Sequence, residues 1–219
     1  MRELLAAVMA LVLFGCGPEE SSTDDRVLKV SWAFSSGDCT SNSIDKVKVS
    51  WGADGMALTD VEFACSAGSG TLGQTAATGG TYSIIMNGLD TGGVVRFSTS
   101  SSLTVGARGT FGVPVDMTLR PKPSNITVTW HFSNGSGCPA QVQLPYAIGI
   151  YNPPAMGTGL GTKVKDTQEG CATKTATLTD IAPGTYIVDL DSRAQQPMIH
   201  ARKNITVVAG ENQTVDLPL

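Results

Sequence analysis

Histidine, charged residues and clustered cysteines are scarce in this chain, and each shortage argues against a class of function. Two histidines in 219 residues leave little material for acid–base chemistry. No cysteine lies near another in the way that zinc sites require. Acidic residues outnumber basic ones, the net charge is −4 and no basic cluster occurs, which argues against nucleic acid as a partner. We therefore expect no metal and no cofactor.

Catalytic motifs are also missing. The chain has no Gly-x-Ser-x-Gly, no His-Glu-x-x-His, no phosphate-binding glycine loop and no calcium loop. His131 falls on the polar side of a strand, and His200 has no paired carboxylate or nucleophile by sequence. Asp189 and Asp191 are expected to face water on one side of a sheet. We expect a protein without enzymatic activity; the alternative is a hydrolase site assembled from distant residues around His131 or His200.

Long apolar runs and helical periodicity are absent as well. The apolar run 4–14 is shorter than the about 20 residues that a helix needs to span a bilayer. The mature chain consists of short alternating runs separated by Gly, Ser, Thr, Asn and Pro, which is typical of half-buried strands. This pattern predicts an all-β fold of antiparallel β-sandwiches.

The N-terminus has the features of an export signal. Residues 1–15 combine a charged start, a short apolar stretch and small residues at its end, as in a secretory signal peptide. The ending Leu13-Phe14-Gly15-Cys16 resembles the lipobox of bacterial lipoproteins, in which the peptide is cut before the cysteine and its sulfur takes a diacylglycerol. The resemblance implies that Cys16 is lipidated and that acyl chains hold the protein to a membrane.

The segment after the lipobox fits an anchored protein. Residues 16–26 are interpreted as a flexible, solvated tether because they are mostly small, polar or acidic. In enterobacterial lipoproteins an Asp after the lipidated cysteine retains the protein on the inner membrane, and this chain has Gly17 there. By resemblance, the expected location is the outer membrane of the bacterial cell envelope. Its periplasmic face and its outer surface are both left as alternatives.

The mature chain repeats one pattern. The alternating run 28–34 (Leu-Lys-Val-Ser-Trp-Ala-Phe) matches the run 126–132 (Ile-Thr-Val-Thr-Trp-His-Phe), and a Ser/Gly-rich turn with a cysteine follows each. The closing strands 115–119 and 215–219 match as well. The repeat predicts one module over 27–120 and a second over 125–219. Alternating prolines make residues 121–124 a semi-rigid linker that sets the modules roughly end to end.

One run of the second module carries a family resemblance. The stretch 175–190 contains Pro183-Gly184-Thr185-Tyr186 and is similar to the Leu-x-Pro-Gly-x-Tyr-x-Val signature of prealbumin-like modules. These include carboxypeptidase-regulatory-like and Cna-B-like repeats of bacterial surface proteins. The first module departs from the signature at residues 91–94 (Thr-Gly-Gly-Val). The resemblance implies prealbumin-like sandwiches, and an immunoglobulin-like or fibronectin-type sandwich stays open.

The cysteines other than Cys16 are expected to form disulfides. Four cysteines allow three pairings, and the repeat selects Cys39 with Cys65 and Cys138 with Cys171, since each pair then lies within one module. An exported protein sits where disulfides persist. In the chain-entropy model each bridge contributes roughly 3–4 kcal/mol.

Candidate ligand residues lie at the edges of expected loops. All three Trp fall on apolar strand faces and are interpreted as core, which leaves Tyr82, Tyr151 and the adjacent Asn152. Long loops are expected over 66–81 and 151–171, and such loops on a rigid sandwich commonly carry binding. We therefore expect a non-enzymatic envelope lipoprotein with a binding, adhesion or structural role toward a protein or glycan ligand. The alternative is an envelope hydrolase or a carbohydrate-processing accessory protein.

Overall fold

The computed structural model describes residues 27–74, 80–105, 115–133, 138, 145–192 and 199–219, which contain fourteen strands and two single 3-10 turns. The first half holds β1 (Val27–Phe34), β2 (Lys46–Ala53), β3 (Thr59–Ala64), η1 (Cys65–Ala67), β4 (Ser69–Gln74), β5 (Gly80–Leu89), β6 (Val95–Val105) and β7 (Val115–Pro121). The second half holds β8 (Ser124–His131), β9 (Tyr146–Tyr151), β10 (Lys163–Glu169), η2 (Cys171–Thr173), β11 (Thr175–Ile181), β12 (Gly184–Asp191), β13 (His200–Val207) and β14 (Gln213–Pro218). The all-β prediction is confirmed.

The predicted signal peptide, Cys16 and the tether lie outside the described residues. In the part of the chain that the structure describes, no helix is long and apolar enough to cross a membrane.

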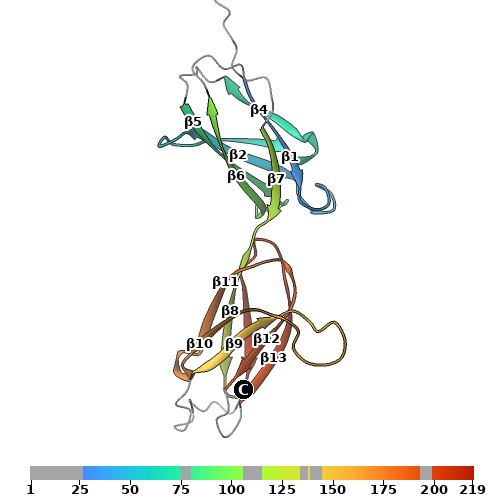
Figure 1. Ribbon diagram of the computed structural model, residues 1–219, viewed down its shortest axis with the longest axis vertical. Coiled ribbons are helices and arrows are strands. Elements are labelled where there is room, and N and C mark those ends of the chain that lie inside the picture. Colours follow the sequence, from blue (N-terminus) through green and yellow to red (C-terminus); the bar gives the residue numbers. More distant parts are fainter. Residues whose placement is uncertain (1–26, 75–79, 106–114, 134–137, 139–144, 193–198) are drawn as a thin grey trace, which may run out of the picture.

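The strands form two lobes that follow one another along the long axis (Figure 1). We call residues 27–121 the N-terminal lobe and residues 124–219 the C-terminal lobe. Each lobe buries the apolar side of its alternating strands around its own core. The N-terminal core includes Leu28, Val30, Trp32, Val47, Val49, Ile84, Met86 and Leu119, and the C-terminal core includes Ile126, Val128, Trp130, Tyr146, Ile148, Ile150, Val188 and Leu217.

The two lobes pair their strands in the same order. β1 pairs antiparallel with β4 and parallel with β7, just as β8 pairs with β11 and β14. β2 pairs with β3 and β5, and β5 with β6, just as β9 pairs with β10 and β12, and β12 with β13. One pairing differs: β6 meets β7 and joins the N-terminal lobe into a seven-stranded sheet, whereas the C-terminal lobe keeps separate sheets of four and three strands.

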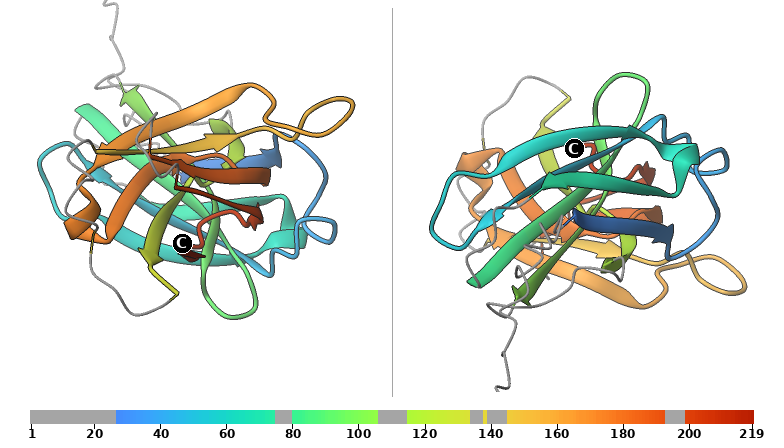
Figure 2. Two further views of the ribbon diagram at one scale, coloured as in Figure 1. Left: turned by 90° about the horizontal axis from the view of Figure 1, so that it is seen from below. Right: turned by 90° about the horizontal axis from the view of Figure 1, so that it is seen from above.

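The parallel pairings place the two chain ends far apart. β7 leads through residues 122–123 into β8, so β1, which runs parallel to β7, begins at the end of its lobe remote from the C-terminal lobe. β14 runs parallel to β8 and therefore ends at the far end of the other lobe. Figure 1 shows the C-terminus at this remote end. Seen along the long axis, the β2–β3 and β9–β10 hairpins project to different sides (Figure 2).

Two disulfides of the structure join the pairs that the repeat predicts. Cys39 and Cys65 are bonded at 2.06 Å and Cys138 and Cys171 at 2.05 Å. Cys65 directly follows β3, which ends at Ala64, and it opens η1. Its side chain still points inward and is 2% exposed.

Two expected loops contain strands. β4 lies within 66–81 and β10 within 151–171, so both predictions of long irregular loops are wrong. β4 has Leu72 as its one large apolar residue, and its Gly70 faces the ring of Phe63, where a Cβ would come within 2.4 Å of Phe63 Cζ. β10 is an edge strand of largely polar, exposed residues. Neither strand shows the large apolar alternation by which a strand is recognised.

Candidate functional site

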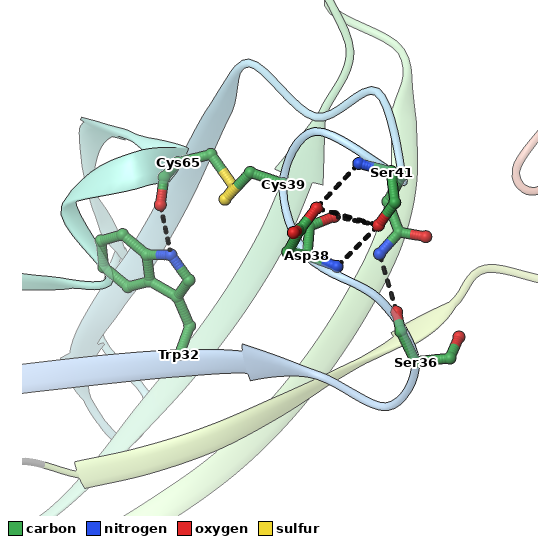
Figure 3. The surroundings of a disulfide bond; sticks show 7 residues. Trp32, Ser36, Asp38, Cys39, Ser41 and Cys65 are labelled. Carbon is green, nitrogen blue, oxygen red and sulfur yellow. Dashed lines mark hydrogen bonds between the residues drawn. A yellow bond between two sulfur atoms is a disulfide. The ribbon is translucent and has the colours of Figure 1, made fainter.

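An open pocket of about 460 Å³ borders the disulfide of the N-terminal lobe. It lies where β1 ends and the loop to β2 begins, and its walls include Trp32, Phe34, Asp38, Thr40, Ser66 and the Cys39–Cys65 bridge. This volume is within the about 300–1,000 Å³ range of small-molecule sites. Figure 3 shows the loop that forms one wall, and the indole of Trp32 that forms another.

The aromatic wall is held rigidly. Trp32 is 8% exposed, and its Nε1 donates a hydrogen bond of 3.0 Å to the carbonyl oxygen of Cys65 (Figure 3). The indole contacts Phe63 at a centroid distance of 5.7 Å, and Phe34 packs edge-on against Phe97 at 5.0 Å. Because the ring orientations are fixed by these contacts, a ligand would meet a preformed apolar surface.

The polar wall is a loop closed by its own side chains. Ser41 N donates 2.8 Å to Asp38 Oδ1, and Asp38 N donates 2.8 Å to Ser41 Oγ. Asn42 Nδ2 donates 2.8 Å to Ser36 O (Figure 3). Gly37 has φ +70°, and a Cβ there would lie 2.4 Å from Ser41 Oγ, so this position requires glycine. The backbone N–H of Ser41 lowers the pKa of the exposed Asp38, which keeps a carboxylate charge at the rim.

Two further depressions flank the same loop. One of about 470 Å³ includes Thr40, Asp45 and Asp90, and one of about 400 Å³ includes Asp45, Lys46 and Glu62. Glu62 is paired with Lys46 at 3.1 Å, and Asp90 with Arg96 at 2.7 Å. Exposed Asp45 and Asp38 therefore give this end of the lobe an acidic character.

The three predicted ligand residues do not come together. Tyr82 is 8% exposed on β5, with its ring 6.4 Å from that of Trp51, so it belongs to the interior and not to a loop edge. Tyr82 shares the inward face of β5 with Ile84.

Tyr151 and Asn152 lie in the other lobe, at the end of β9. The Tyr151 ring covers Gly149, where a Cβ would lie 2.5 Å from Tyr151 Cε2. Asn152 closes the base of the following loop through its backbone, since its N–H bonds to Thr162 O at 2.9 Å and its carbonyl accepts from Gly161 N at 3.0 Å. Their role in ligand binding stays a prediction.

Each histidine meets a carboxylate. His131 is exposed on its strand, as expected, and its Nδ1 lies 3.1 Å from Asp216 Oδ1. His200 Nε2 lies 2.7 Å from Asp189 Oδ1, so the expectation that it has no carboxylate partner is wrong. Among the described residues, the hydrogen-bond partners of the two imidazoles are these carboxylates and, for His200 Nε2, Arg202 Nη2 at 3.4 Å.

Asp189 is not the water-facing residue that alternation predicts. It is 7% exposed, and besides His200 it accepts a 2.9 Å bond from Arg202 Nε, which stands opposite it on β13. Alternation gives the face of a strand but not what covers that face, and the covering cation is known only once β12 and β13 are in register. Asp191 is half-buried on the same strand.

The described residues contain no group of three His, Cys, Asp or Glu side chains placed to hold a metal ion.

No protein-family model and no curated protein sequence matches this chain.

Three solved structures illustrate what the chain is similar to. They are the Bacillus anthracis TIE protein (14% identity, TM-score 0.37, 88% of this chain and 33% of that chain), a candidate adhesin from Bacteroides ovatus (10%, 0.36, 84% and 69%) and a streptococcal ancillary pilin (13%, 0.31, 90% and 63%). The chain spans about a third of the length of the TIE protein.

Proposed function

We propose that this protein is a non-enzymatic lipoprotein of the bacterial cell envelope, anchored at Cys16, with a binding, adhesion or structural role. In this proposal two sandwich modules form a stiff arm that carries the C-terminal lobe away from the membrane. The single observation that carries the proposal is the junction between the lobes. β1 begins and β14 ends on the sides of their lobes that lie away from this junction.

The junction is centred on Arg96. Its Nε donates 2.8 Å to Asp90 Oδ2 within the N-terminal lobe, while Nη1 reaches Ala209 O at 3.1 Å and Glu211 Oε1 at 2.5 Å in the C-terminal lobe. The Arg96 side chain is only 17% exposed, so water screens these contacts less than it would on an open surface. A planar guanidinium with several fixed donors holds both lobes in one orientation.

The backbone reinforces this contact. Lys122 N donates 2.8 Å to Arg96 O, and Gly210 N donates 2.9 Å to Lys122 O. Gly210 has φ +69°, and a Cβ there would lie 2.0 Å from Val95 O, so only glycine fits between the lobes. Two lobes joined by two residues and by these bonds act as one stiff body rather than as beads on a flexible linker.

The strand order supports prealbumin-like modules over immunoglobulin-like ones. In the immunoglobulin fold the first two strands belong to the same sheet. In the C-terminal lobe β8 lies in the three-stranded sheet with β11 and β14, and β9 lies in the four-stranded sheet with β10, β12 and β13. In the N-terminal lobe β1 pairs directly with β4 and β7, and β2 with β3 and β5, although the β6–β7 contact joins the two groups into one sheet. We infer that both lobes are modules of one prealbumin-like type.

The anchor is tested by labelling growing cells with a clickable palmitate analogue. The full chain should be labelled, and its Cys16→Ala variant should not be. Equal labelling of the two proteins would contradict the anchor.

Stiffness is tested by measuring distances between spin labels. Met56 and Met156 are 71% and 93% exposed at the two lateral hairpins, so a Met56→Cys/Met156→Cys protein offers one label on each lobe. The distance distribution should be narrow and should broaden with Arg96→Ala. A broad distribution before that change would refute the stiff arm, whatever the labelling result.

A further inference from the structure

The pocket beside the Cys39–Cys65 bridge has the composition of a site for a positively charged organic molecule. Two aromatic side chains, a disulfide and the backbones of Gly37 and Gly68 supply an apolar floor. Thr40 and Ser66 supply hydroxyls, and Asp38 is the one charged residue among the residues that line it. A mostly apolar cavity with a few convergent polar groups is the usual make-up of a small-molecule site.

We propose that this pocket binds a small organic cation, an ammonium or guanidinium group on an apolar stem. The inference rests on the proposed binding role and names its ligand class. The apolar stem would lie against Trp32 and Phe34, and the cationic group would face the Asp38 carboxylate.

Charge complementarity decides the sign of the ligand. The loop that carries Asp38 also carries Asp45, and the adjoining depressions add Glu62. Lys46 neutralises Glu62, and none of the described residues that line the pocket is a Lys, Arg or His. An anion would therefore be repelled by the Asp38 carboxylate, whereas a cation would be attracted to it.

Preorganisation makes the site suitable for a small ligand. The indole of Trp32 is fixed by its bond to Cys65 O, and the loop of Asp38 is closed by Ser41. Neither wall has to be ordered when a ligand enters, so little conformational entropy is lost on binding.

The C-terminal lobe offers an internal control for detecting binding. Trp130 Nε1 donates 3.3 Å to Cys171 O, in the same way as Trp32 does to Cys65 O. Two-dimensional proton–nitrogen NMR of the full chain resolves both indole N–H groups. Titration with benzylamine should shift the Trp32 resonance and leave that of Trp130 in place. Equal shifts of both, or no shift of Trp32, would overturn the proposal.

Charge selectivity is measured with probes of one shape. Benzylamine should bind more tightly than benzyl alcohol, and benzoate should bind least, because only the first is a cation. Equal affinity for all three would overturn the assigned ligand class.

Matched variants locate the charge. Asp38→Asn should weaken benzylamine binding about three-fold, as expected for an exposed ion pair, without affecting benzyl alcohol. Asp45→Asn removes the same charge from the same loop but outside this pocket, and should change the affinity by less than two-fold. Phe34→Ala should weaken both probes by about ten-fold because it removes apolar surface. Equal effects of Asp38→Asn and Asp45→Asn would refute the site.

Failure of the ligand and failure of the stiff arm can be told apart. Neither palmitate labelling nor the distance between hairpin labels involves a residue of the pocket. If the protein takes up the palmitate label and gives a narrow distance distribution but does not bind benzylamine, the proposed function stands and the ligand class assigned to the pocket is refuted.

Discussion

The two lobes share a strand order but stabilise it with different side chains. In the N-terminal lobe, the aromatic partner of the buried Trp32 is Phe63 on β3. In the C-terminal lobe, the partner of Trp130 is Tyr146 on β9, whose hydroxyl also donates 3.2 Å to Cys171 Sγ. What both lobes keep is the bond from the indole to a cysteine carbonyl. The fold thus depends on strand pairing and on this tryptophan–cysteine contact more than on any one packing partner.

A second contrast concerns the outer face of the larger sheet. Asn87 on β5 accepts a 2.8 Å bond from Ser98 on β6. In the C-terminal lobe, Asp189 on β12 is bound instead by Arg202 on β13. A neutral cross-strand pair in one lobe thus contrasts with a buried ionic cluster in the other, so the two lobes should respond differently to the loss of charge.

The largest expected difference is between the two buried tryptophans. Trp130→Ala should destabilise its lobe by about 3–5 kcal/mol, because it removes a large, fully packed side chain. Trp32→Ala should cost less, since one side of this indole already faces the pocket. Hydrogen exchange followed by mass spectrometry reports each lobe separately. An equal loss of protection in both variants would break the comparison.

Removing the disulfides should have similar effects in the two lobes. The bridges close loops of similar separation, 26 and 33 residues, so each double Cys→Ala variant should lose roughly 3–4 kcal/mol. The C-terminal variant should lose slightly more, because Tyr146 then loses its sulfur acceptor. Urea unfolding under oxidising conditions measures both. Tyr146→Phe in the C-terminal double variant should add nothing further, and an added loss would contradict the role given to this hydroxyl.

The ionic cluster should be more sensitive than its neutral counterpart. Asp189→Asn should cost about 1–3 kcal/mol in stability, because it leaves Arg202 and His200 without a charged acceptor. The Asp189 side chain is only 9% exposed, so water cannot fully replace it. Asn87→Ala, which removes the neutral pair with Ser98 in the N-terminal lobe, should cost about 0.5–1.5 kcal/mol. Denaturant midpoints measured for each lobe test the order. A larger loss from Asn87→Ala would show that the buried charge stabilises nothing.

The sequence identifies the strands that carry large apolar residues. The alternation of Leu28, Val30 and Trp32 and its repeat at Ile126 and Val128 predict β1 and β8, and the repeat then selects the cysteine pairs. β4 and β10 are not predicted because most of their residues are small or polar. They form strands because each pairs with the hydrogen-bonding edge of a neighbouring strand. Pairing creates these elements, so a pattern of single residues does not reveal them.

The candidate site was less predictable than the fold. Alternation correctly marks Trp32 as interior, and for that reason it hides the edge of the indole that lines a pocket. The opposite wall is a loop of small residues whose shape depends on Gly37 and on the contact between Asp38 and Ser41. The residues of this loop show no binding motif in the sequence. The loop lines a pocket only because the fold and the Cys39–Cys65 bridge place it beside Trp32.

The smallest effect is expected from acid. In the N-terminal lobe the pKa values of Asp38, Asp60 and Asp90 are lowered from the ordinary value of 3.8. The main causes are the backbone N–H of Ser41 for Asp38, the Lys48 ammonium for Asp60 and a backbone N–H of the β5–β6 turn for Asp90. A carboxyl with a lowered folded-state pKa binds protons more weakly in the folded chain than in the unfolded one.

The sign of the acid effect follows from this difference. The stabilisation is complete above the unfolded pKa, near 3.8, and is lost as the pH falls below it through the folded values. The urea midpoint of the N-terminal lobe should therefore decline between about pH 5 and pH 2, with the C-terminal lobe followed in parallel. Asp60→Asn should flatten this decline, because an amide cannot be protonated in this range and Lys48 has already lost its charged partner. If the urea midpoint of Asp60→Asn falls with pH as steeply as that of the unchanged protein, the acid sensitivity does not come from Asp60. That result would contradict the electrostatic difference expected between the lobes.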